Sequence, residues 1–418
     1  MLKAIVVSTC ALISSAAIAQ PIFSEVPTYG LPSKVNNLGT VVGTATANGY
    51  RWRPSDGLTT FAGIRITDIS DDNQVMISPT HGKWTASTNQ WQAPRGYQFN
   101  TTPCPNPPCI YYTQATQSYC NTDGSIIAGT AFEPPPNNCH RRAALWNSSG
   151  DTPAVFVSDG YLNGGTIECS SVASMKGVSS DGEVVWGIDE NQNINAARAF
   201  VWHNGVKRSA FQGSGNIAIG GATPDGRYLA GFGVSAGGGG INFRGIYDTI
   251  NLAHINFPAN YWPRCMAETS MLVAGEFGPN IGQGRAFMRL ESGQFLDLYD
   301  HLIANNAQGP IAGWTLLAVY AVSRNGRYLA GAGYNAQGTF RAFRVDLQGL
   351  TCDSIDFNND GSTFDPQDID AFLSVYSEGP CVPDTATCND IDFNNDGSIF
   401  DPRDIDAFLS VYGEGPCF

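Results

Sequence analysis

Two short stretches near the C-terminus carry oxygen-bearing side chains at alternating positions. Asp356, Asn358 and Asp360 precede Gly361, and the same order of residue types recurs over residues 392–397. Carboxylate and amide oxygens at alternating positions, followed by a glycine that permits a sharp turn, form the first half of a calcium-binding loop. The sequence therefore predicts two sites for a cation that prefers hard oxygen ligands.

The second half of each loop fits this chemistry if one residue is inserted after the serine that follows the glycine. Asp365 then takes the ninth position of the loop and Asp368 supplies the last carboxylate. We expect each loop to bind one Ca²⁺ ion; the alternative is that these turns are solvated linkers and that Asp365 only caps a helix. The complete predicted ligand set is Asp356, Asn358, Asp360, Ser362, Asp365, Asp368, Asp392, Asn394, Asp396, Ser398, Asp401 and Asp404.

A helix must follow each loop to position its last carboxylate. Pro366 stands at the first helical position, where its missing N–H removes no hydrogen bond. Each unit is therefore predicted to be one loop and one helix with an apolar face. The residues at helical spacing on this face are Ile369, Phe372, Leu373 and Tyr376 in the first copy, and Ile405, Phe408, Leu409 and Tyr412 in the second.

Cysteines begin and end both units. The natural pairs are Cys352 with Cys381 and Cys388 with Cys417. A unit of this size buries too little apolar surface to fold alone, so we expect a metal and a crosslink to stabilise it jointly.

These paired units resemble a dockerin domain, and the terminal Gly-Pro-Cys is similar to a variant with a Gly-Cys type signature. The resemblance covers residues 352–418, with repeats at 352–381 and 388–417. It implies two bound Ca²⁺ ions and a cohesin-like receptor or surface scaffold that holds the protein. The inserted loop residue and the flanking cysteines are departures from the dockerins of cellulosomes.

The N-terminus has the pattern of a secretory signal peptide over residues 1–19. Lys3 precedes an apolar stretch that is too short to span a bilayer, and Ala17-Ile18-Ala19 fits a cleavage site. We therefore expect a bacterial protein that is secreted and is extracellular or associated with the cell surface, without a transmembrane span. A net charge of -14 argues against nucleic acid and anionic lipid as partners.

The middle of the chain, residues 20–348, repeats one β pattern. Charged residues make up only 14% of the chain and Gly numbers 47, a composition typical of short strands and tight turns. Each copy has a tight turn, an apolar strand that ends in Gly, a loop, and a strand with an aromatic centre. The turn pairs of the seven copies are Leu38-Gly39, Asp72-Asn73, Asp123-Gly124, Asp181-Gly182, Asp225-Gly226, Ser270-Met271 and Asn325-Gly326.

Such copies must pack against one another, because an isolated hairpin or small sheet is unstable in water. We predict a mainly β fold in which a seven-bladed β-propeller precedes a small α-helical calcium-binding module, with a linear β-solenoid as the alternative. The Ser-x-Asp-Gly and Arg-Ala-Phe-x-Trp elements resemble the HAF-type family of extracellular repeats. That resemblance implies secretion and a repetitive β body, and it assigns no catalytic residues.

The chain has 11 cysteines, and Cys10 lies in the predicted signal peptide. The remaining even number, outside the cytoplasm, favours disulfides over free thiols. The expected pairs in the body are Cys104 with Cys109, Cys120 with Cys139, and Cys169 with Cys265.

The sequence contains no recognisable reaction signature. None of the five His stands at metal-ligand spacing from another or beside a nucleophile motif. We expect a non-catalytic β-repeat body, with a glycan or a protein as its ligand, tethered through the C-terminal module. The alternative is a carbohydrate-active propeller enzyme, a glycoside hydrolase or polysaccharide lyase, whose acid–base pair would come from carboxylates such as Asp189, Glu190, Glu276 and Asp297.

Overall fold

The computed structural model describes most of the chain from residue 20 to residue 412. The predicted signal peptide, residues 1–19, lies outside the described part. The described residues are 20–94, 98–100, 110–112, 115–132, 141–147, 155–158, 171–191, 196–213, 216–234, 241–279, 282, 284–347, 355–360, 362, 365–377, 379–382, 388–389, 391, 393 and 402–412.

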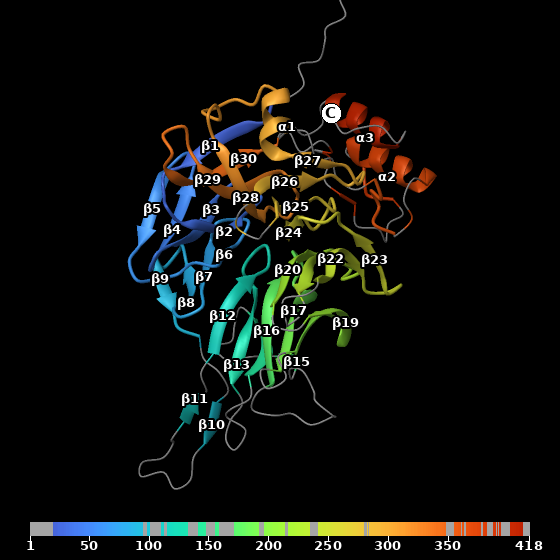
Figure 1. The fold of residues 1–418 in the computed structure, drawn as a ribbon. Helices are drawn as coiled ribbons and strands as arrows, with labels where there is room; N and C mark the ends of the chain where they lie inside the picture. The colour runs from blue at the N-terminus through green and yellow to red at the C-terminus, as the bar shows by residue number, and fades with distance from the viewer. Residues whose placement is uncertain are drawn as a thin grey trace, which may run out of the picture.

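In these residues the strands form seven blades of four antiparallel strands (Figure 1), and one parallel pairing, Arg141 with Val172, joins blades 3 and 4 into a single eight-stranded sheet. Blade 1 contains β2 (Leu31–Val35), β3 (Val41–Ala45), β4 (Asn48–Arg53) and β5 (Gly57–Phe61). Blade 2 contains β6 (Asp68–Ile69), β7 (Val75–Ser78), β8 (Gly82–Thr85) and β9 (Gln90–Gln92). Blade 3 contains β12 (Ala115–Cys120), β13 (Ile126–Phe132), β14 (Arg141–Asn147) and β15 (Val155–Ser158). Blade 4 contains β16 (Ser171–Val178), β17 (Val184–Asn191), β18 (Ala196–His203) and β19 (Val206–Gly213).

The last three blades follow the same plan. Blade 5 contains β20 (Asn216–Ala222), β21 (Tyr228–Val234), β22 (Ile241–Asp248) and β23 (Ala253–Asn256). Blade 6 contains β24 (Tyr261–Met266), β25 (Val273–Phe277), β26 (Arg285–Arg289) and β27 (Phe295–Asp297). Blade 7 contains β28 (Thr315–Val322), β29 (Tyr328–Tyr334), β30 (Phe340–Asp346) and β1 (Ile22–Val26).

Five further elements lie outside the blades. No helix of the described residues has the length and apolar character needed to cross a bilayer. The strands β10 and β11 pair with each other in a separate two-stranded ribbon. The bounds of these elements are β10 (Gln98–Asn100), β11 (Ile110–Tyr112), α1 (Leu298–Ala304), α2 (Pro366–Tyr376) and α3 (Pro402–Tyr412).

The blades close into a ring. The first strand, β1, pairs antiparallel with the last strand, β30, from Ile22 opposite Asp346 to Val26 opposite Ala342. The first strands of consecutive blades contact one another in sequence order, and β28 of blade 7 contacts β2 of blade 1. This closure confirms the predicted propeller and excludes the linear solenoid, whose ends would stay apart.

The predicted turn pairs connect the inner strand of each blade to its second strand. In blade 4 the hydroxyl of Ser179 accepts a hydrogen bond from the Val184 N–H at 2.9 Å and donates one to Asp181. Gly182 completes this turn with a φ of 83°, a conformation that costs glycine little. Thr223 and Ser323 make the same bonds in blades 5 and 7, so this element fixes the turn between the first and second strands of these blades.

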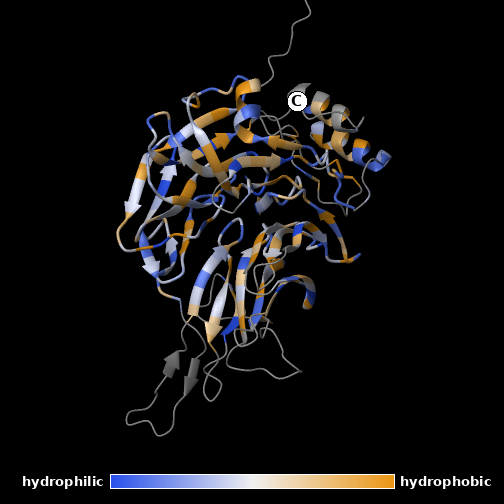
Figure 2. Cartoon of the chain, in the orientation of Figure 1, coloured by the Kyte–Doolittle hydropathy of each residue, from blue (hydrophilic) through white to orange (hydrophobic). Residues whose placement is uncertain are grey.

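Apolar side chains fill the space between neighbouring blades, and Figure 2 shows apolar stretches along the strands. Phe23 of the closing strand β1 is 1% exposed. Its ring lies 5.0 Å from that of Trp314 and 5.7 Å from that of Phe343, centroid to centroid. The strand that closes the ring is therefore also a core element.

In the C-terminal region, α2 and α3 share one apolar core. The rings of Phe372 and Phe408 stack with centroids 4.1 Å apart, beside Phe357 from the first loop. The predicted buried face is wrong at Leu373 and Leu409, which are 51% and 54% exposed. The buried stripe runs through the preceding phenylalanines, and the next residue on a helix points about 100° away from that stripe.

We predict that Phe23→Ala lowers the free energy of unfolding by about 3–5 kcal/mol, because it leaves a cavity in the core and weakens the strand that closes the ring. Urea unfolding followed by tryptophan fluorescence measures the change. Leu38→Ala is the matched control, since Leu38 is 59% exposed. A Phe23→Ala loss no larger than that of the control would show that ring closure does not depend on β1.

Candidate functional site

The oxygens of the first C-terminal loop turn toward a shared backbone donor. The N–H of Asp360 lies 3.0 Å from Oδ1 of Asp356 and 3.0 Å from Oδ1 of Asn358. Oδ1 of Asp360 accepts from the Ser362 N–H at 2.8 Å. The positive φ of Asn359, 54°, lets the chain wrap in this way. Three side chains of the predicted ligand set are therefore brought together in the structure.

Asp365 and Asp368 link this loop to helix α2. Asp365 is the N-cap and accepts from the N–H groups of Gln367 at 2.8 Å and Asp368 at 3.1 Å, so the capping role raised by the sequence is present. Asp368 is 0% exposed, and its two oxygens accept from the N–H groups of Phe357 at 2.8 Å and Asp365 at 3.2 Å. The last predicted carboxylate is thus held against the start of the loop.

The residues present fit a calcium ion by donor type. Burial, together with the charge of Asp365, raises the pKa of the Asp368 carboxyl above its ordinary value. A nearby cation would offset this cost of burying a carboxylate. Within the described residues, no three His, Cys, Asp or Glu side chains are gathered as a metal cluster, so a cation here would also need the amide of Asn358 and a backbone carbonyl such as that of Ser362.

The second loop can be compared only at its end. Asp404 is 0% exposed at the start of α3, as Asp368 is at the start of α2. The other five predicted ligands of this loop lie outside the described residues: Asp392, Asn394, Asp396, Ser398 and Asp401.

The predicted pairing of the C-terminal cysteines is wrong. A disulfide joins Cys381 to Cys388, so the pairs of Cys381 with Cys352 and of Cys388 with Cys417 are not formed. The two bonded residues are seven positions apart, at the end of the first repeat and the start of the second. The crosslink therefore joins the two units rather than closing each one; Cys352 and Cys417 lie outside the described residues.

Two of the predicted disulfides in the body are also wrong. Cys120 and Cys265 are free thiols, buried on the inner strands β12 and β24. Residues on these strands pack in the centre of the ring, away from the surface loops that were expected to supply their partners. The expected partners Cys139 and Cys169, and the predicted pair of Cys104 and Cys109, lie outside the described residues.

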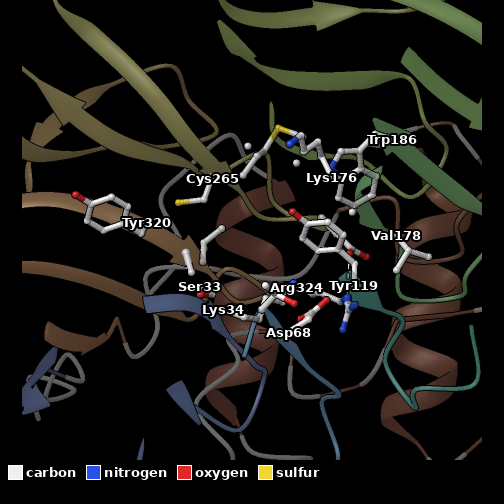
Figure 3. A pocket seen from close by; sticks show the side chains of 18 residues that line it. Ser33, Lys34, Asp68, Tyr119, Lys176, Val178, Trp186, Cys265, Tyr320 and Arg324 are labelled. Atoms are coloured by element: carbon white, nitrogen blue, oxygen red, sulfur yellow. Dashed lines mark hydrogen bonds and ion pairs between the residues drawn. The ribbon is translucent and has the colours of Figure 1, made fainter. Parts of the chain in front are cut away.

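A cavity of about 80 Å³ lies at the centre of the ring, with walls from the inner strand of every blade. Figure 3 shows the charged side chains of Lys34, Lys176 and Arg324 around it, together with Tyr119. Ser33, at one end, is exposed, whereas Arg324 is only 3% exposed. The centre of this propeller is therefore a polar, charged channel.

Arg324 is the centre of a charge network that closes this channel. Its Nε donates to Oε1 of Glu268 at 2.9 Å and its Nη1 to Oδ2 of Asp71 at 3.0 Å. Its Nη2 donates to the carbonyl of Cys120 at 2.6 Å. Burial opposes the charge of Arg324, but Glu268 and Asp71 outweigh it and hold the pKa of the guanidinium above its ordinary value.

Backbone bonds extend this central charge network, formed by Asp71, Glu268 and Arg324, to other blades. Oε2 of Glu268 accepts from the Ser180 N–H at 2.9 Å, and Oδ1 of Asp71 accepts from the Asn37 N–H at 3.0 Å. Asn37, Asp71, Ser180 and Arg324 each directly precede the predicted turn pair of their blade, and Glu268 lies two residues before its pair. Sequence reasoning missed them, although charges at this position were the available signal.

The carboxylates considered for catalysis do not form an acid–base pair. Glu276 lies 2.9 Å from Arg264, Asp297 lies 3.1 Å from Arg285, and Asp189 pairs with Lys207. Each acid therefore has its own basic partner. Glu190 follows Asp189 in β17, and successive residues of a strand face opposite sides of the sheet, so these two do not converge either.

We predict that Arg324→Met destabilises the fold by about 3–5 kcal/mol, because it leaves Glu268 and Asp71 buried without their cation. Chemical unfolding measures this, and Arg285→Met is the control, since its ion pairs are half exposed and worth less than about 1 kcal/mol. Adding Glu268→Gln to Arg324→Met should restore part of the loss. Equal effects of Arg324→Met and the control would contradict a central role for this network.

We predict that iodoacetamide labels Cys120 and Cys265 only after unfolding. Burial keeps the reagent out and raises the pKa of both thiols, that of Cys265 to about 12. Peptide mass spectrometry without reductant should also recover Cys381 linked to Cys388. Labelling of the native protein, or a crosslink that includes Cys120, would refute this cysteine assignment.

The chain matches no protein-family model and no curated protein. It is similar to a chain of a mitotic checkpoint complex at 12% identity and a TM-score of 0.39, covering 81% of this chain and 98% of that chain. Against the β-propeller domain of the trilobed protease from Pyrococcus furiosus, identity is 10% and the TM-score 0.45, over 79% and 94% of the chains. Against TolB from Acinetobacter baumannii, identity is 13% and the TM-score 0.37, over 63% and 61%. The chain is a mainly β protein with a propeller fold and a small helical C-terminal region, as its sheets and ring closure show.

Proposed function

We propose that this protein is a secreted, non-catalytic β-propeller that is held at a cell surface or scaffold by a calcium-binding, dockerin-like C-terminal module. The observation that carries the proposal is the position of Asp368. This carboxylate is fully buried at the start of α2 and is tied to the loop in which Asp356 and Asn358 turn toward one N–H. A buried acid beside an oxygen-rich turn is the arrangement that a calcium ion stabilises.

In the first unit, Asp356, Asn358, Asp360 and Asp368 would hold the ion, with Ser362 giving its backbone carbonyl. Calcium supplies positive charge and oxygen coordination, and so links the loop to the helix behind it. The stacked rings of Phe372 and Phe408 transmit this order between the units, because each helix uses the other to bury its apolar face.

A surface suited to a receptor lies on the same pair of helices. Leu373 and Leu409 occupy equivalent positions of α2 and α3, and about half of each side chain is exposed. Exposed leucines at matched positions of a crosslinked, calcium-ordered module favour a protein partner, and a cohesin-like receptor fits the dockerin resemblance.

The side chains that line the propeller channel support a non-catalytic role for the propeller. The carboxylates that line its channel are Asp68 and Glu268. Asp68 accepts from the N–H groups of Ile69 and Cys120, and Glu268 is bonded to Arg324 and Ser180. A general acid or base must be able to exchange a proton with a substrate, and these groups are occupied by structural partners.

Calorimetric titration of the intact protein with CaCl₂ tests the calcium step. We expect two ions per chain, and we expect Asp356→Ala and Asp392→Ala each to remove one, since each deletes the first ligand of one loop. Asp370→Asn is the matched control, because Asp370 is exposed on α2 outside the ligand set and should still bind two ions. No calcium uptake by the intact protein, or equal uptake by all variants, would contradict the proposed module.

A further inference from the structure

Two lysines line the central channel, and neither makes a short ion pair with another residue of the described part of the chain. The chain contains only five lysines, and Lys34 of β2 and Lys176 of β16 both line the cavity. Among the described residues, neither side chain forms an ion pair or a side-chain hydrogen bond. Arg324 also lines this cavity, together with the two acids Asp68 and Glu268, so the lining carries one more positive than negative side chain in a protein of net charge -14.

The acidic groups that line the cavity have their short-range partners elsewhere. Both oxygens of Asp68 accept backbone N–H groups, at 2.8 Å from Ile69 and 2.9 Å from Cys120. Glu268 is committed to Arg324 at 2.9 Å. Lys34 acts on Glu268 only through space: its positive charge lowers the pKa of Glu268, against the raising effect of burial.

The same walls offer aromatic surface and neutral donors. Trp186 is 6% exposed and its indole N–H has no hydrogen-bond partner in the structure. Its ring lies against Gly177, where an added Cβ would come within 2.2 Å of ring carbons. Burial, together with the charge of Asp68, raises the pKa of Tyr119 to about 12, so this hydroxyl stays protonated and able to donate.

We infer that this channel binds the carboxylate of an acidic saccharide, with Lys34 and Lys176 as the recognising cations. A space of about 80 Å³ admits the charged end of such a ligand, and its lining includes both the exposed Ser33 and the buried Arg324. Two ammonium groups in a partly enclosed site attract an oxyanion more strongly than the same groups in water. The indole N–H of Trp186 and the hydroxyl of Tyr119 are neutral donors beside the cations, and such donors suit the hydroxyl groups of a sugar better than an inorganic ion.

Calorimetry on the intact protein with sodium glucuronate as the probe tests this site, independently of calcium binding by the tail. Lys34→Gln and Lys176→Gln should each weaken binding at least tenfold, and Lys34→Arg should retain it. Lys83→Gln is the matched control, because Lys83 donates to the Gly124 carbonyl at 3.0 Å outside the cavity. Equal thermal unfolding midpoints would show that the variants are folded.

Three further probes show whether the carboxylate and the sugar ring of glucuronate both contribute to its affinity. Glucose should bind at least tenfold more weakly than glucuronate, because it lacks the carboxylate. Sodium sulfate and glutamate should also bind more weakly, because they lack the sugar ring. Absence of glucuronate binding, equal binding of any of these three probes, or unchanged binding in both glutamine variants would overturn the assignment. Since Asp356→Ala leaves this channel intact, its loss of calcium should not change glucuronate affinity.

Discussion

The propeller depends on one buried cation. Arg324 lies where the turns of several blades meet, and its bonds to Asp71 and Glu268 join residues that are 253 and 56 positions away in the chain. Burying a guanidinium is costly, and only the paired acids make it tolerable, so each charge of the network requires the others. The ring closed by β1 and β30 is what brings them together. Closure at the rim and charge pairing at the centre therefore stabilise the same arrangement of blades.

The buried charge network around Arg324 also determines the lining of the central channel. Arg324 and Glu268, 3% and 5% exposed, line the cavity of about 80 Å³ at the centre of the ring. Its acids are used structurally, whereas Lys34 and Lys176 remain unpaired with any described side chain. Among the described residues, the carboxylates considered for catalysis each have a basic partner or face opposite sides of a sheet. Ligand recognition would then belong to the propeller, and attachment would belong to residues 352–418.

The sequence predicts what depends on local chemistry. The seven turn pairs lie between the first and second strands of the blades. In blades 4, 5 and 7 a hydroxyl, an Asp or Asn and a glycine of positive φ specify this turn without distant partners. Asp365 and Pro366 locate the start of α2 for the same reason. Residue spacing alone does not determine which segments of the chain meet in space. It therefore does not predict the central charge network, the two channel lysines or the Cys381–Cys388 bond. The prediction that Leu373 belongs to the buried face of α2 was wrong, because the apolar face predicted from residue spacing is broader than the stripe that is buried.

The central claim is that residues 352–418 attach the protein to its surroundings when calcium orders them. The most direct test is the fraction of purified protein that stays bound to cells of the organism that makes it, in Ca²⁺ and in EGTA. The full chain is compared with a chain that ends at residue 348, beyond the strand that closes the ring. The account predicts retention of the full chain in Ca²⁺, release by EGTA, and no retention of the shorter chain. Equal retention of both chains, or retention that EGTA does not affect, would contradict it.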